Sequence, residues 1–188
     1  MQKLVDIIKH SGKETSTHCE RVAQYVKIFF SKDNYGYTPQ QIQYIINGAY
    51  LHDIGKSAID KSILYKTSKI TEDEMNILRR HSAYGYEILT KHKTSFSSDE
   101  EYEICRNIAL MHHRRLNNTG YPIIPDQELD DYIQIVSILD VFDALTSERC
   151  YQKPVTREEA LRIIDSGAGG FFSEELRENL RFYIQKII

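Results

Sequence analysis

The sequence of 188 residues contains few cysteines and lacks any long apolar segment. The three cysteines, Cys19, Cys105 and Cys150, lie far apart and form no CxxC pair. Neither a disulfide framework nor a thiolate zinc site is therefore predicted, and a reducing cytoplasm is favoured. We expect no signal peptide, because residues 1–20 include three acidic side chains and no long apolar run. We expect no membrane association either, because no segment approaches the roughly 20 apolar residues of a transmembrane helix.

An excess of positive charge is also absent. Lys and Arg total 24 and Asp and Glu total 27, which gives a formal net charge of −3. A protein that binds DNA or RNA normally carries a basic face, so no nucleic-acid polymer is expected as a partner. The charge is compatible with a small anionic substrate, because bound dications reverse the local sign of a site.

Strand patterns are the third absence. Apolar residues recur at helical spacing almost throughout, and hydrophobic residues make up 41% of the chain, as is ordinary for a soluble globular protein. The sequence predicts an all-α, single-domain helical bundle over residues 1–188, without a linker. The expected helices cover about 16–31, 39–53, 60–64, Thr71 to about Leu89, a segment around Cys105 to His112, 129–147, 156–166 and 173–187.

Seven polar residues stand out against this apolar pattern. Asp140 shares a helical stripe with Ile133 and Val136, which should face the core. A buried carboxylate costs several kcal/mol unless it is paired or binds a cation. Any one histidine alone could be a hydrogen-bonded core residue, but one metal centre explains the whole set. The set is His18, His52, Asp53, His81, His112, His113 and Asp140.

Two pairs in this set are adjacent in sequence. Neighbouring residues on a helix point about 100° apart, so His112 and His113 can reach one site only if the helix ends or distorts there. The Asn-rich loop that follows favours such an end. The same reasoning places His52-Asp53 at a helix end, because Gly55 follows.

The run HDIGK at 52–56 resembles the HD superfamily of metal-dependent phosphohydrolases. The pair His112-His113 followed by TGYP at 119–122 narrows the resemblance to the HD-GYP family. Further matching runs are LYK at 64–66, KITEDE at 69–74 and ILDVFDALTS at 138–147, so the resemblance extends from about Thr17 to Ser173. It implies an all-α bundle and hydrolysis of cyclic di-GMP, a bacterial second messenger, to a linear dinucleotide or GMP.

The resemblance also assigns residues by position. It makes all seven residues of the set metal ligands, Lys56 a catalytic or phosphate-contacting residue, and Arg149 a phosphate contact. Some family members add a glutamate one turn before the first histidine and bind three metals. Glu14 stands four residues before His18, which suits that role, but an exposed Glu in a first helical turn suits the helix dipole equally well. Two or three divalent ions are expected, and a His and carboxylate set without thiolate favours iron or manganese.

A mechanism follows from paired metals, which lower the pKa of a bridging water and bind the phosphodiester oxygens. Asp53 is the expected bridge, because a carboxylate can span two ions and a neutral imidazole cannot. His52 and Asp140 would complete the coordination of one ion, and His81, His112 and His113 would bind the other. Lys56 would stabilise phosphate charge or protonate the leaving oxygen, unless it merely complements a helix C-terminus. Tyr121 would shape the loop or stack on a guanine, or simply pack the turn.

The chain departs from the family pattern at two places. Arg114-Arg115 and Asn117-Asn118 replace the usual Glu-Arg and Asp-Gly. Arg149 is followed by Cys-Tyr-Gln instead of Pro-Tyr and a basic residue, with Lys153 as a candidate substitute. These changes leave three functions open. They are a cyclic di-GMP phosphodiesterase, a phosphohydrolase for another nucleotide such as 3′,3′-cyclic GMP-AMP, and a weakly catalytic scaffold that binds a diguanylate cyclase through its Gly-Tyr-Pro loop. A homodimer is compatible with each.

Overall fold

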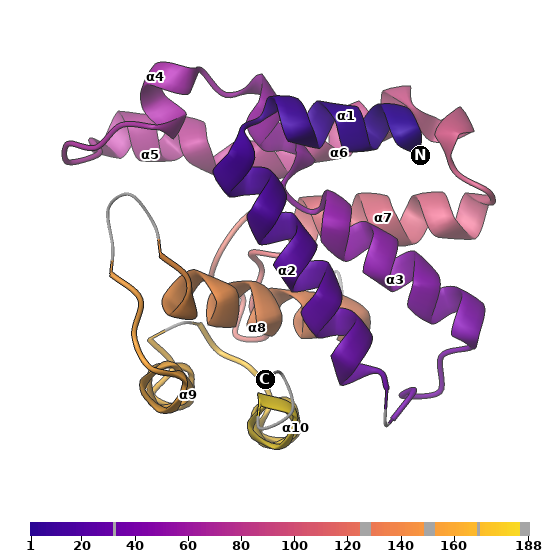
Figure 1. Ribbon diagram of the computed structural model, residues 1–188, viewed down its shortest axis with the longest axis vertical. Coiled ribbons are helices and arrows are strands. Elements are labelled where there is room, and N and C mark those ends of the chain that lie inside the picture. The colour runs from indigo at the N-terminus through magenta and orange to yellow at the C-terminus, as the bar shows by residue number, and fades with distance from the viewer. Residues whose placement is uncertain (32, 125–128, 149–152, 169, 185–188) are drawn as a thin grey trace.

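The computed structural model describes residues 1–188 except 32, 125–128, 149–152, 169 and 185–188. The described residues form α-helices and two short 3₁₀ helices, with no β-strand among them, which confirms the all-α prediction. The elements are α1 Gln2–His10, α2 Lys13–Phe29, α3 Pro39–Leu51, η1 Ile54–Ala58, α4 Lys61–Leu64, α5 Glu72–Arg79, α6 His81–Lys91, η2 Lys93–Ser95, α7 Asp99–Met111, α8 Asp131–Thr146, α9 Arg157–Asp165 and α10 Glu174–Ile184 (Figure 1).

Local sequence signals explain where several helices begin. The side chain of Thr71 accepts a hydrogen bond from the Glu74 N–H at 3.2 Å, and Glu74 accepts one from the Thr71 N–H at 2.9 Å. This reciprocal capping box, predicted from the sequence, begins α5. Thr38 forms a similar box with Gln41 at the start of α3, where Pro39 occupies the first turn.

Two elements differ from the sequence prediction. Helix α1 is not among the predicted helices, yet its Leu4 and Ile8 are fully buried. The single helix expected from Thr71 to Leu89 is two helices, α5 and α6, which divide at Arg80. The Arg80 N–H bonds to the Ile77 carbonyl, a tightened 3₁₀-type turn that ends α5. The break places His81 at the first position of α6.

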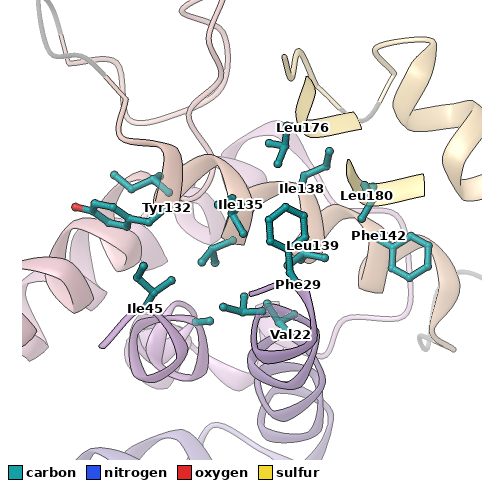
Figure 2. Packing of buried hydrophobic residues seen from close by; sticks show 14 of the residues in the cluster. Val22, Phe29, Ile45, Tyr132, Ile135, Ile138, Leu139, Phe142, Leu176 and Leu180 are labelled. Carbon is teal, nitrogen blue, oxygen red and sulfur yellow. The ribbon is translucent and has the colours of Figure 1, made fainter. Parts of the chain in front are cut away.

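Helix α8 supplies much of the main apolar core. Helix α2 contacts α3 and α8, α3 contacts α7, and α6 contacts α7 and η1, while α9 and α10 cover the other side of α8 (Figure 1). Almost every side of α8 is buried, as its run of apolar residues requires. Figure 2 shows part of this core, with labelled side chains Val22, Phe29, Ile45, Tyr132, Ile135, Ile138, Leu139, Phe142, Leu176 and Leu180.

A second, smaller apolar cluster joins α1 to α2, α3, η1, α6 and α7, and includes Leu51, Ile54 and Ala109. Here η1 lies directly on α6. A Cβ added at Gly55 would come within 1.9 Å of the His81 carbonyl oxygen, so only glycine allows this approach. The close approach brings the HD pair at the end of α3 next to His81 at the start of α6.

Candidate metal centre

The structure brings the seven predicted residues together from five segments. His18 lies on α2 and Asp140 on α8, and both are buried. The remaining ligand candidates stand at helix ends, with His81 opening α6. His52 caps the C-terminus of α3 and His112 caps that of α7, which confirms that both adjacent pairs lie where a helix stops.

One group of three side chains forms the first half of the cluster. His18 Nε2 lies 3.0 Å from Asp140 Oδ1 and 3.2 Å from His52 Nε2. His52 Nε2 is 3.8 Å from the same Asp140 oxygen. The three ligand atoms therefore surround one point at which a single cation could sit.

The second half consists of histidines alone. His81 Nε2 lies 3.3 Å from His112 Nε2 and 3.2 Å from His113 Nε2. These three nitrogens also converge tightly enough for one ion.

Asp53 lies between the two halves and directs one oxygen at each. Its Oδ2 is 3.4 Å from His52 Nε2 and 3.6 Å from His18 Nε2. Its Oδ1 is 3.3 Å from His81 Nε2 and 3.9 Å from His112 Nε2. This is the placement that a bridging carboxylate needs.

The hydrogen bonds behind the rings decide which nitrogens face the cluster. Nδ1 lies 2.7 Å from the Ala49 carbonyl oxygen in His52 and 2.7 Å from the Leu78 carbonyl oxygen in His81. A carbonyl only accepts, so each Nδ1 carries the proton and donates, and Nε2 presents a lone pair. His112 is oriented in the same way by α7 carbonyls.

The Nε2 lone pairs of the neutral His81 and His112 face each other at 3.3 Å and repel unless a cation lies between them. A ring fixed through Nδ1 with Nε2 directed inward is the usual arrangement of a metal-binding histidine. The donor set thus fits two cations, one in each half, with Asp53 between them.

The electrostatics keep most of the ligands in their metal-binding forms. Burial lowers the pKa of His81 and His112, and lowers that of His113 to about 3, so these imidazoles are neutral. Burial alone would raise the pKa of Asp53, but Lys56 and His52 hold it well below its usual value. His52 differs, because the Asp53 carboxylate outweighs burial and raises its pKa.

Asp143 and Arg21 complete the site and were not identified from the sequence. Asp143 Oδ2 accepts a hydrogen bond from His18 Nδ1 at 2.6 Å, and Arg21 donates to both Asp143 oxygens at 2.6 and 2.8 Å. The signal that could have revealed them is spacing, since Asp143 and Arg21 each follow a ligand, Asp140 and His18, by three residues on the same helix.

Lys56 and Tyr121 border the centre. Lys56 Nζ is 2.5 Å from Asp53 Oδ2. The Tyr121 ring stacks on that of His113, with centroids 4.5 Å apart. Gly120 makes this loop return to His113, because it has φ +83° and a Cβ there would lie 2.0 Å from the His113 carbonyl oxygen.

The other expected contacts are placed less closely. Glu14 lies in the first turn of α2, so the helix does extend back far enough to align it with His18, but its side chain is exposed and outside the groups described above. Lys153 is exposed just before α9. Arg149 lies outside the described residues, so its expected phosphate contact stays a prediction.

The HD domain family model matches residues 15–145, and the chain therefore belongs to the HD domain family. Its similarity to cyclic di-GMP phosphodiesterases agrees with the HD-GYP resemblance. The response regulator RpfG of Xanthomonas campestris pv. campestris is 34% identical over 92% of this chain and 44% of the relative. A cyclic di-GMP phosphodiesterase of Thermotoga maritima is 34% identical over 90% of this chain and 45% of its own length. The 3'3'-cGAMP-specific phosphodiesterase 2 of Vibrio cholerae is 33% identical over 94% of this chain and 33% of its own. The chain thus spans less than half the length of these relatives.

Solved structures support the fold. Bd1817, an HDGYP protein from Bdellovibrio bacteriovorus, gives a TM-score of 0.69 at 17% identity and covers 90% of this chain and 52% of its own. The HD domain of the phosphodiesterase PgpH from L. monocytogenes, in complex with cyclic di-AMP, gives 0.65 at 18% identity, with 96% and 92% covered. Among the described residues, no helix combines the length and apolar character needed to cross a membrane. Family membership and the His/Asp cluster together support binding of divalent metal.

Proposed function

We propose that this chain is a metal-dependent phosphodiesterase that hydrolyses a cyclic dinucleotide, with cyclic di-GMP as the first candidate and a linear dinucleotide or GMP as product. The observation that carries the proposal is Asp53, whose two oxygens face two separate ligand triads. The similar proteins that are named cyclic di-GMP phosphodiesterases supply the substrate class.

The chain's own residues divide the work. His18, His52 and Asp140 would hold one ion and the three histidines of the other half would hold the second. When bound, paired divalent cations activate a water molecule and offset the negative charge of a phosphodiester. The donor set of imidazole and carboxylate, without thiolate, suits iron or manganese.

Lys56 is the proposed catalytic side chain beside the ligands. Its ammonium reaches Asp53, so it lies where a phosphodiester would meet the centre. There it would neutralise charge on a non-bridging oxygen or donate a proton to the leaving oxygen. Arg149 and Lys153 are proposed as further phosphate contacts.

A second candidate substrate is 3′,3′-cyclic GMP-AMP. One relative with comparable identity is named for that substrate. The altered loop of this chain also places a buried arginine, Arg114, where the HD-GYP pattern has a glutamate. A diguanylate cyclase partner, a homodimer and a cytoplasmic location stay predictions.

The direct test is turnover of cyclic di-GMP, 3′,3′-cyclic GMP-AMP and cyclic di-AMP by metal-depleted and metal-reconstituted protein, with products resolved by chromatography. We expect activity only after reconstitution with iron or manganese. Asp53→Ala should abolish it and lower metal content, whereas Asp73→Ala, an exposed carboxylate on α5, should not. Full activity of Asp53→Ala would refute the assignment.

A further inference from the structure

A cavity of about 560 Å³ opens beside the all-histidine half of the metal centre. His81, His113 and Tyr121 form its inner side. Its outer side comes from α4, the segment that follows it, and α5, which project at one end of the bundle (Figure 1). The volume is within the range of about 300–1,000 Å³ that is typical of sites for small molecules and cofactors.

The outer wall of this cavity is apolar, unlike the metal centre. Ile63, Leu64, Ile70, Met75 and Leu78 line it. Met75 is 39% exposed, so part of its side chain is open to a ligand in the cavity. An apolar surface does not bind a charged phosphate. It can pack against the flat face of a nucleobase, whose stacking contributes roughly 1–3 kcal/mol.

Apart from those of its inner side, the polar side chains that line the cavity are four cations, together with the hydroxyl side chains of Thr67 and Ser68. The charged groups that line the cavity, among the residues the structure describes, are Lys56, Lys66, Lys69 and Arg79, with no carboxylate. Lys66 is engaged by both Glu74 oxygens at 2.7 Å. The Arg79 guanidinium lies 5.9 Å from the centre of the Tyr121 ring, and one of its five N–H groups donates to Asn76.

Such a wall distinguishes the two purines. Guanine presents two adjacent acceptors, O6 and N7, which a guanidinium can bind with two N–H donors, whereas adenine pairs its N7 acceptor with an N6 amino donor. An amino donor that faces Arg79 would meet guanidinium N–H groups, which cannot accept a hydrogen bond. The cavity is therefore complementary to guanine.

We propose that this cavity receives one guanine base of the substrate, with Met75 packing on the base and Arg79 binding O6 and N7. The proposal rests on the proposed function, because it needs the phosphodiester to lie at Asp53. The cavity needs only one guanine base in the substrate. Cyclic di-GMP and 3′,3′-cyclic GMP-AMP should therefore both bind, and cyclic di-AMP should bind at least about tenfold more weakly.

The chain offers a matched control for each residue. Ile77 is on the same helix as Met75 and is 37% exposed, but it does not line the cavity, and the Arg80 guanidinium next to Arg79 packs over Tyr84 instead. In metal-reconstituted protein, the four variants Met75→Trp, Ile77→Trp, Arg79→Met and Arg80→Met would be compared. The measured quantity is kcat/KM for each cyclic dinucleotide relative to kcat/KM for bis(p-nitrophenyl) phosphate, a phosphodiester without a base.

Met75→Trp should lower this ratio for cyclic di-GMP at least about tenfold, because the indole fills the space of the base. Arg79→Met should remove the preference for cyclic di-GMP over cyclic di-AMP. Ile77→Trp and Arg80→Met should behave as wild type. The assignment of the base cavity is overturned if Met75→Trp and Arg79→Met keep the wild-type kcat/KM ratio and substrate preference. It is also overturned if neither variant lowers these quantities more than its control does.

Calorimetric titration of the same proteins with cyclic di-GMP, in the metal-depleted form that cannot turn over the ligand, separates this proposal from the proposed function. If wild type hydrolyses no phosphodiester, the catalytic proposal fails, yet binding that is lost in Met75→Trp and Arg79→Met and kept in their controls would still support the cavity. If hydrolysis is robust and binding is equal in all five proteins, the cavity assignment fails and the catalytic proposal stands.

Discussion

Asp143→Asn tests how the first half of the metal centre is held in place. The Asp143 side chain is completely buried and accepts hydrogen bonds from His18 Nδ1 and from two Arg21 nitrogens. An asparagine keeps one acceptor oxygen and replaces the other with an NH₂ group, which cannot accept. Either His18 or Arg21 therefore loses its partner, and the negative charge that balances Arg21 disappears.

The expected magnitude has two parts. Loss of a carboxylate that orients a metal-binding histidine typically weakens metal affinity 10- to 100-fold, or about 1.4–2.8 kcal/mol. The second part concerns the fold. Burial alone would raise the pKa of Asp143. The hydrogen bonds and charges of Arg21 and His18 outweigh burial and lower the pKa from the ordinary 3.8 to about 2. The ionised carboxylate therefore contributes about 2 kcal/mol of stability above pH 4, and this contribution is lost as the pH falls from about 4 to 2.

The assay is calorimetric titration of metal-free protein with Mn²⁺, together with urea unfolding at pH 7 and at pH 3. We expect the affinity of one ion to fall while the ion on the all-histidine half is retained. The free energy of unfolding at pH 7 should drop by about 2 kcal/mol, with a smaller difference at pH 3. Asp131→Asn, an exposed position on the same helix, serves as the control. Unchanged affinities and unchanged unfolding in Asp143→Asn would refute the reasoning.

Three further changes probe other parts of the centre. Lys56→Ala should retain metal but lower kcat by about 10²–10³-fold, because it removes a cation aimed at developing charge, and a wild-type rate would exclude its proposed role. Glu14→Ala should lower the metal content by one equivalent if a third ion binds between Glu14 and His18, whereas two equivalents in both proteins would rule out that ion. Gly55→Ala should destabilise the protein by at least about 3 kcal/mol, because the new Cβ meets backbone atoms of α6. Its control is Gly36→Ala, where the new Cβ meets open space, and this change should cost about 1 kcal/mol. Urea unfolding measures both.

The all-helical fold could be predicted from the sequence because the apolar spacing is regular. The capping box at Thr71 and the end of α7 at His112 were also readable from local residue types. Helix α1 was not, because its burial depends on partners distant in sequence. The break at Arg80 was missed as well, since neither a proline nor a glycine marks it, and tertiary packing of η1 on α6 favours it.

The ligand set was predictable for a different reason. Buried polar groups on apolar faces need a partner, and one metal centre supplies it for all of them. The sequence could not show which oxygen of Asp53 faces which triad, because that depends on how α3 and α6 meet. It also could not show the base cavity, because its wall is made of ordinary apolar residues such as Leu64 and Met75. The sequence places Asp143 on the same helical stripe as Asp140 but gives it no role, because its bond to His18 depends on how α2 and α8 pack together.

The most direct test of the central claim is anomalous diffraction from crystals of the protein reconstituted with manganese. We expect at least two strong peaks per chain, one within about 2.0–2.3 Å of ligand atoms from the His18 group and one equally close to the His81 group, with Asp53 touching both. A single peak that Asp53 does not touch, or peaks more than about 4 Å from these side chains, would contradict it.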